Sequence, residues 1–272
     1  MESNNPVFRR SGAFSNRGYA TFDAPPPSAA SLQELYDAPS ATAVQTGRMT
    51  LDDVIAKTGL MFVVLLIGAA ASWFVLTPRT PAVPFLAMIV GLVLGMVIAF
   101  KQSTSPGLIL TYAAVEGVFV GGISLFYSSY ADARSDGVNI VAQAVLGTLA
   151  AFALMLVLYR SGKLRATPKF TKMLLVAGGA YLLIALVSFV TAMFGVGDGW
   201  GLRTGGLGLL LCAAGVALAS FFLILDFDFI EQGIRNGAPE RTSWLAGFGL
   251  MVTLVWLYLE ILRLLAILRG SD

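Results

Sequence analysis

Residues 254–268 read LVWLYLEILRLLAIL, and this stretch decides the fold because it places Glu260 and Arg263 inside an otherwise apolar run. With its flanks, the run covers residues 243–268, which is long enough for a helix to cross the hydrocarbon core of a bilayer. A charge near the middle of a membrane helix is costly unless it faces a partner or a wet cavity. The stretch therefore predicts a membrane helix in which the acid at position 260 has a function.

The composition of the whole chain agrees with this interpretation. Of its 272 residues, 57% are hydrophobic and 12% are charged, and the mean hydropathy is +0.78. We expect an all-α, polytopic integral membrane protein. Seven apolar segments have the length of a transmembrane helix, at about 58–76, 82–100, 107–127, 139–159, 172–194, 206–230 and 243–268.

The residue types that are missing narrow the chemistry. The chain has no His and a single Cys212, which excludes a disulfide framework and the common His or Cys metal sites. We expect no tightly bound cofactor, only calcium or protons as permeant or regulating ions on carboxylate oxygens.

The chain divides into a tail and a membrane domain. Residues 1–48 are rich in Ser, Ala, Pro and Asn without apolar periodicity, so we expect a disordered tail followed by a seven-helix domain over residues 49–272. Thr50, with Asp52 and Asp53 after it, is typical of a helix start.

Lys and Arg in the short loops predict the orientation. Ten of them fall on the side that holds the start of the first helix and four on the other side, with Arg263 inside its span. Because basic loops stay inside, we expect a cytoplasmic N-terminus and an outside C-terminus.

Three acids lie well inside apolar spans: Glu116, Asp226 and Glu260. At 100° per residue, Asp226 and Asp228 point to nearly opposite sides of their helix. Asp228 shares a stripe with Glu231 and Arg235, which predicts an ion-paired helix end. Asp226 is then expected to face the bundle.

Glu260 has two interpretations. Arg263, three residues later, can neutralise it within its own helix. Alternatively, Asp226 and Glu260 meet across two helices, share a proton, and form a transient cation site or a gate when they lose it. A length estimate opposes the meeting: Asp226 lies about 30 Å from Gly206 along its segment, and Glu260 about 25 Å from the start of its own, which runs the other way.

Three motifs suggest a family. Residues 224–231 read ILDFDFIE, residues 257–262 read LYLEIL, and residues 112–117 read YAAVEG. Together they resemble the transmembrane Bax inhibitor motif (Bax inhibitor-1-like) family, which carries Leu/Phe-x-Asp-Thr-Gln in its sixth helix, Leu-Tyr-Leu-Asp-x-x-Asn in its last helix and a glutamate-glycine signature. The tail looks like that of a bacterial, actinobacterial branch, which implies the bacterial cell (inner) membrane.

The resemblance implies a central last helix surrounded by the other six. It also implies an acid pair from the last two helices, here Asp226 and Glu260, that acts as a pH-sensitive gate for calcium leak. The chain departs from the family pattern in the sixth-helix motif and in the last-helix motif. It also lacks the second-helix arginine of some relatives. Lys101 and Arg263 are therefore candidate counter-charges, and Glu116 is a candidate member of the ion pathway.

Two other functions compete with the leak. A non-transporting regulator would bind another membrane protein, such as the membrane-bound protease linked to bacterial relatives, through its tail and its small-residue pairs.

An enzyme is suggested by residues 195–198, which read GVGD like intramembrane aspartyl proteases, but a loop turn explains Asp198 better. We expect a lipid bilayer around the protein, no enzymatic activity and no nucleic-acid partner. The small-residue pairs are Gly91 with Gly95, Gly117 with Gly121, Gly178 with Gly179, and Ala213 with Ala217.

Overall fold

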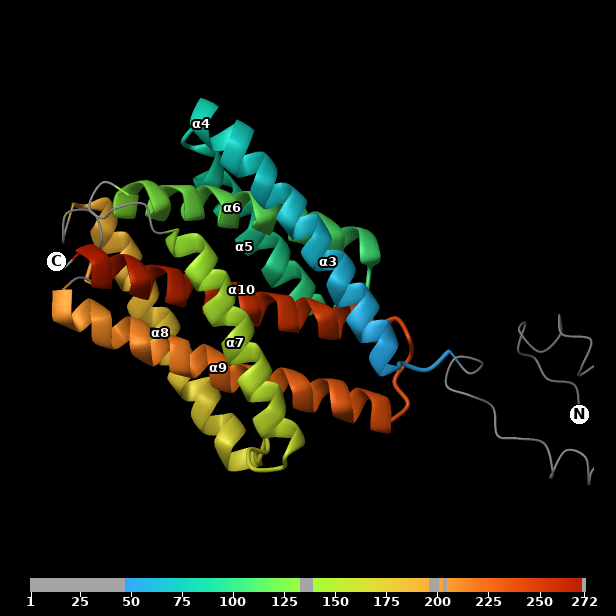
Figure 1. The fold of residues 1–272 in the computed structure, drawn as a ribbon. Coiled ribbons are helices and arrows are strands. Elements are labelled where there is room, and N and C mark those ends of the chain that lie inside the picture. Colours follow the sequence, from blue (N-terminus) through green and yellow to red (C-terminus); the bar gives the residue numbers. More distant parts are fainter. Residues whose placement is uncertain (1–46, 133–138, 196–200, 203–204, 271–272) are drawn as a thin grey trace, which may run out of the picture. The chain divides into compact units, whose positions relative to one another are not determined.

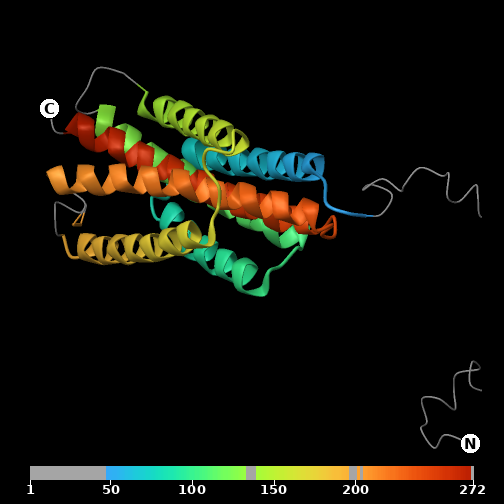
Figure 2. The same ribbon diagram turned by 90° about the horizontal axis from the view of Figure 1, so that it is seen from below.

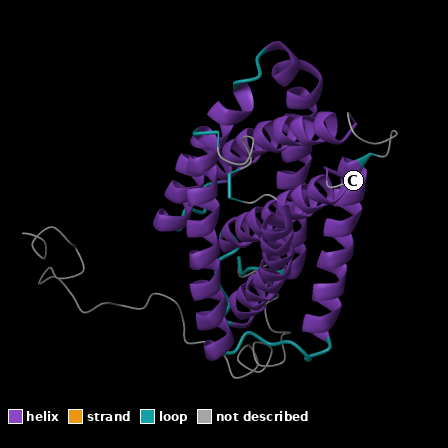
Figure 3. Cartoon of the chain, turned by 90° about the vertical axis from the view of Figure 1, so that its left-hand side faces the viewer, coloured by secondary structure: helices purple, strands orange, loops and turns teal. Residues whose placement is uncertain are grey.

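The computed structural model describes residues 47–132, 139–195, 201–202 and 205–270, and within them all regular secondary structure is helical (Figures 1 and 3). The predicted tail lies outside the described residues, except for Gly47 and Arg48. Among the described residues, seven spans are long and apolar enough to cross a membrane, which confirms the expected fold class. The helices are α3 (Leu51–Ala71) with its extensions η2 (Ser72–Leu76) and α4 (Thr77–Arg79), α5 (Val83–Lys101), α6 (Pro106–Asp132), α7 (Ile140–Arg160), α8 (Pro168–Met193), α9 (Gly205–Arg235) and α10 (Thr242–Gly270).

The helix starts follow local side-chain chemistry. The Thr50 hydroxyl accepts from the backbone N–H of Asp53, and the Asp53 carboxylate accepts in return from the backbone N–H of Thr50. This reciprocal capping box satisfies two of the donors that a helix start leaves open. The predicted start at Thr50 is therefore confirmed. Asn139 and Thr167 also cap the starts of α7 and α8, but each makes one side-chain hydrogen bond and not the reciprocal pair.

Successive spans run in alternating directions, so the chain has two loop ends (Figure 1). One end holds the starts of α3, α6, α8 and α10, and we call it the basic end because most of the described Lys and Arg residues lie there. At the opposite end the described residues include only Arg79 and Arg269 of these types. The members of the basic end are Arg48, Lys57, Lys101, Arg160, Lys163, Arg165, Lys169, Lys172, Arg235 and Arg241.

The C-terminal helix α10 is the central element. It packs on α3, α6, α7 and α9, and its membrane-spanning window is more buried than that of any other described span. Figures 1 and 2 show α9 and α10 side by side through the middle of the bundle. The helices α5 and α8 lie mainly against α6 and α9, and many of their large apolar side chains are exposed. In a bilayer these side chains contact lipid.

Small residues bring α3 and α6 into close contact. At Gly117 and Gly121 of α6, an added Cβ atom would collide with the backbone carbonyls of Leu65 and Ala69. The same crossing leaves no room at Gly68 of α3. Gly117 and Gly121 thus form an internal packing seam, as the spacing predicts. Ala213 and Ala217 are exposed, however, and the prediction that they form a seam is wrong. The buried glycines and alanines of α9 are Gly208, Gly215 and Ala219, and the last two lie about 200° around the helix from Ala213 and Ala217, on nearly the opposite face.

The segment before α3 is tied to the connection between α9 and α10. Arg48 and Pro239 form an isolated antiparallel bridge, and the backbone N–H of Met49 donates to the carbonyl of Ala238 at 2.8 Å. Lys57 then makes an ion pair of 2.9 Å with Glu240. These contacts fix the first described residues at the basic end of the α9–α10 hairpin.

Candidate functional site

Asp226 lies on α9 and faces α10. One carboxylate oxygen, Oδ1, is 3.4 Å from the place where a Cβ atom at Gly249 would stand, and the side chain is hydrogen-bonded to Thr253. The other oxygen, Oδ2, is buried and has no hydrogen-bond partner among the described residues. Buried polar atoms are nearly always satisfied, so this oxygen is suited to binding a proton or a cation. The prediction that Asp226 faces the bundle is confirmed.

Glu260 lies on α10, is only 5% exposed, and faces α9 at Gly215. A Cβ atom at Gly215 would stand 2.9 Å from the carboxyl carbon of Glu260 and 2.7 Å from Cζ of Tyr181 in α8. The bare glycine therefore makes the space into which the glutamate and the tyrosine both reach. The ring of Trp256 packs 5.8 Å from that of Tyr181, centroid to centroid, and encloses this end of the site.

The two acids do not meet in this structure. Asp226 is level with Gly249, and Glu260 is level with Gly215. On α9, eleven residues separate positions 215 and 226, and on α10 eleven residues separate positions 249 and 260. At 1.5 Å per residue, both helices place the acids about 16 Å apart along the bundle.

The expected shared-proton dyad is therefore corrected. Asp226 and Glu260 lie on one seam, the contact line between α9 and α10, but at two levels. The physical reason is the antiparallel register of a short hairpin, which pairs the end of α9 with the start of α10. Because α9 approaches its end where Asp226 lies and Glu260 is well past the start of α10, no tilt of packed neighbours makes them level.

Arg263 is one turn beyond Glu260 on α10 and is partly buried. Residues three apart are neighbours on a helix surface, so its guanidinium is within reach of the Glu260 carboxylate. The interpretation of Arg263 as the counter-charge of Glu260 stays a prediction.

Glu116 occupies a separate site on α6. It is hydrogen-bonded to Tyr112 one turn earlier, and its Oε2 is 3.0 Å from the place of a Cβ atom at Gly91 in α5. Tyr112 in turn packs edge-on against Phe248 of α10, with ring centroids 5.0 Å apart. Glu116 thus faces α5, whereas Asp226 faces Gly249 of α10, and the structure brings these acids to different interfaces.

Lys101 does not act as a counter-charge in this structure. It is the last residue of α5, is exposed, and makes no ion pair with any described residue. Its position at the end of a span places its ammonium at the polar boundary, where it is solvated.

The polar end of α9 is built as the sequence predicts, with one addition. Arg235 forms the expected ion pair with Glu231, and Asp228 accepts from Gln232 at 2.5 Å. The addition is Tyr159 of α7, whose hydroxyl donates to Glu231. This cluster ties α7 to α9 at the basic end and lies on the side of α9 away from Asp226.

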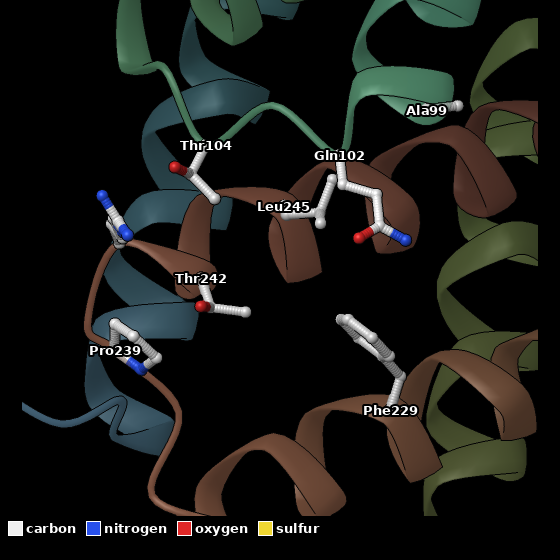
Figure 4. Close-up of a pocket in the computed structure, with 8 residues that line it drawn as sticks. Ala99, Gln102, Thr104, Phe229, Pro239, Thr242 and Leu245 are labelled. Atoms are coloured by element: carbon white, nitrogen blue, oxygen red, sulfur yellow. The ribbon is translucent and has the colours of Figure 1, made fainter.

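A pocket of about 450 Å³ opens at the basic end of the seam (Figure 4). Phe229, one turn after Asp226, lies on one side of it, and Leu245, one turn before Gly249, lies on another. Two residues of the pocket lining are therefore one helical turn along the chain from Asp226 and Gly249. The residues around it are Ala99, Gln102, Thr104, Phe229, Pro239, Arg241, Thr242 and Leu245.

Two expectations concern other kinds of site. Asp198, the acid of the protease-like string, lies outside the described residues. Within the described residues, no group of three or more His, Cys, Asp or Glu side chains is placed to hold a metal. Each level of the seam offers one carboxylate.

The comparison with protein families agrees with the three sequence motifs. The family model described as Bax inhibitor 1 like matches residues 5–270. The chain belongs to the Bax inhibitor 1 like family. None of the curated proteins that were compared matches it.

Several residues of the site in this Bax inhibitor 1 like chain are not evident from its sequence. Gly215, Tyr181 and Thr253 line the two acid levels, yet each is an ordinary residue within an apolar helix. A signal for Gly215 exists: from position 215 to 226, eleven residues turn a helix by just over three full turns, so both share a face. Tyr181 has no such signal, because its role depends on how α8 packs.

Proposed function

We propose that this Bax inhibitor 1 like protein is a non-enzymatic, pH-regulated cation leak in which Asp226 and Glu260 are two successive acid sites. The observation that supports the proposal is that both acids lie on the single α9–α10 seam, where Oδ2 of Asp226 is buried without a hydrogen-bond partner among the described residues. Calcium is the ion that we propose, because hard cations are bound by oxygen ligands and the ligands that these two acids supply are oxygens.

The few oxygen ligands at each acid and the distance between the two acids suit the passage of a cation better than its tight binding. A bound calcium ion normally takes six to eight oxygens, whereas each level here combines one carboxylate with a hydroxyl-bearing neighbour, Thr253 or Tyr181. Such a site binds an ion weakly, and conduction requires binding that is weak enough for the ion to leave. Two weak sites about 16 Å apart also divide the crossing of the membrane into shorter steps.

Protonation provides the regulation. A protonated carboxyl group is neutral and loses its attraction for a cation. We therefore expect calcium flux to fall as the pH is lowered. Two sites at different levels would contribute separately to this profile.

The test is calcium release from liposomes that contain the purified protein and an enclosed calcium indicator. Asp226→Asn and Glu260→Gln should each slow the initial release about tenfold, equivalent to roughly 1.4 kcal/mol, and change its pH profile. Asp228→Asn is the matched control, because it removes a carboxylate two residues away on another face of α9. Release that is equal in all four proteins would contradict the proposal.

That contradicting result would favour the regulator, which binds a membrane protein such as a quality-control protease. Its supporting test is a pull-down from native membranes with and without residues 1–48. The structure uses Gly117 and Gly121 inside the bundle, so these glycines are not free to form an outside seam.

The basic end supports a proposed location and orientation. We place the protein in the bacterial inner membrane with its basic end and N-terminus in the cytoplasm, since loops rich in Lys and Arg are retained there. Thiol labelling of single cysteines in intact cells checks this: a cysteine at Lys163 should be protected from an impermeant reagent, and one at Thr80 should be labelled.

A further inference from the structure

The pocket at the basic end has a chemistry of its own, independent of the two acids. Arg241 brings a positive charge, and Gln102, Thr104 and Thr242 bring an amide and two hydroxyl groups. None of the described residues that line the pocket is acidic, and the nearest carboxylate along the chain from Arg241, that of Glu240, is paired with Lys57. A guanidinium among neutral hydrogen-bonding groups is suited to a phosphate.

Gln102 is held in an unusual conformation at this pocket. Its φ is 45°, which makes it the only described non-glycine residue with a positive φ. The left-handed conformation at a helix C-terminus favours Gly or Asn, and a longer side chain there costs free energy. Figure 4 shows the Gln102 side chain pointing from the end of α5 into the pocket, with Phe229 facing it from α9. The strained residue thus supplies the pocket with a hydrogen-bonding group.

The other half of the pocket is lined by apolar side chains. Phe229 is 49% exposed, and Leu245 and Ala99 complete this side. The pocket lies where α5 ends at Lys101 and α10 begins at Thr242, so it is at the level where a membrane-spanning segment meets water. Lipid phosphates lie at this level, with their chains on the apolar side.

We propose that this pocket binds an anionic phospholipid from the leaflet at the basic end. The phosphate contacts Arg241, Gln102 and Thr242, and the start of an acyl chain lies against Phe229 and Leu245. A free phosphate ion would use the same polar groups, but it would leave the apolar half without a partner. The proposal does not depend on cation conduction.

The test is native mass spectrometry of the purified full-length protein titrated with phosphatidylglycerol. Arg241→Ala should weaken the binding of the first lipid about tenfold, because it removes a charge-assisted contact. Thr104→Trp should weaken it similarly by filling the pocket while keeping the charge. Arg160→Ala is the matched control, since Arg160 is an exposed arginine at the same end outside the pocket.

Each outcome decides the proposal. Weakening in both pocket variants, with unchanged binding in Arg160→Ala and weaker binding of phosphatidylcholine to the native protein, supports the lipid site. Equal binding in Arg241→Ala and Arg160→Ala would overturn it. Displacement of phosphatidylglycerol by millimolar inorganic phosphate would assign the pocket to the free ion, which also overturns the lipid. Unchanged melting temperatures of the variants exclude misfolding as the cause of any loss.

Discussion

Replacing Gly68 by alanine should separate two helices of the bundle. A Cβ atom there would stand 2.5 Å from the carbonyl oxygen of Ala114, whereas an ordinary contact begins at 3.4 Å. The helices α3 and α6 must therefore move apart by about 0.9 Å, the difference of these distances. Because the obstacle is backbone, no side chain can rotate away. We expect a loss of about 1–3 kcal/mol in the free energy of unfolding, as for other overpacked sites.

Gly59→Ala in the same helix is the control. Nothing lies within 4 Å of its added Cβ atom, so alanine should stabilise α3 by roughly 0.5–1 kcal/mol through its better helix propensity. The assay is reversible unfolding in mixed micelles of increasing denaturing-detergent content, followed by circular dichroism. If Gly68→Ala is as stable as Gly59→Ala, α3 and α6 are not in backbone contact and the packing described for them is incorrect.

Three further predictions concern a buried hydrogen bond, a strained residue and an exposed ion pair, and each is checked by the same unfolding assay. Ser124→Ala should cost about 1–3 kcal/mol, because it leaves the buried Tyr258 hydroxyl without the 2.6 Å partner it has now; Tyr258→Phe should cost less, since Ser124 keeps its bond to the backbone. Gln102→Gly should stabilise the protein by about 1 kcal/mol by relieving the left-handed conformation, while weakening lipid binding. Glu240→Gln should cost less than about 1 kcal/mol, and high salt should reduce that cost, because its pair with Lys57 is partly exposed. If Glu240→Gln lowers the free energy of unfolding more than Ser124→Ala does, this exposed ion pair stabilises the protein more than its exposure predicts.

Much of the fold was predictable because a bilayer imposes strict requirements. A chain that must satisfy its backbone groups in lipid forms helices of about 20 residues, so apolar length alone located the seven spans. Local chemistry also sufficed at Thr50, where a hydroxyl and an acid three residues later define the helix start. The face of Asp226 followed from helical periodicity, since Asp228 had to point elsewhere.

The levels and partners within the site depended on information that no single helix contains. The predicted dyad of Asp226 and Glu260 is wrong because the short connection between α9 and α10 sets their register, in line with the lengths of the two helices. The role of Tyr181 depends on the packing of α8, and the pocket requires the ends of three helices to converge. Ala213 and Ala217 have the right spacing for a seam but lie on the lipid side of α9.

Disulfide cross-linking shows whether Asp226 and Glu260 lie at separate levels of the α9–α10 seam or meet in one place. Cys212 is first replaced by alanine, and cysteine pairs are then introduced at Asp226 with Gly249 and at Asp226 with Glu260. A disulfide needs Cα atoms within about 7 Å, so oxidation of membranes should cross-link the 226/249 pair and leave the 226/260 pair reduced. Cross-linking of the 226/260 pair as readily as the 226/249 pair would contradict the account and restore the dyad.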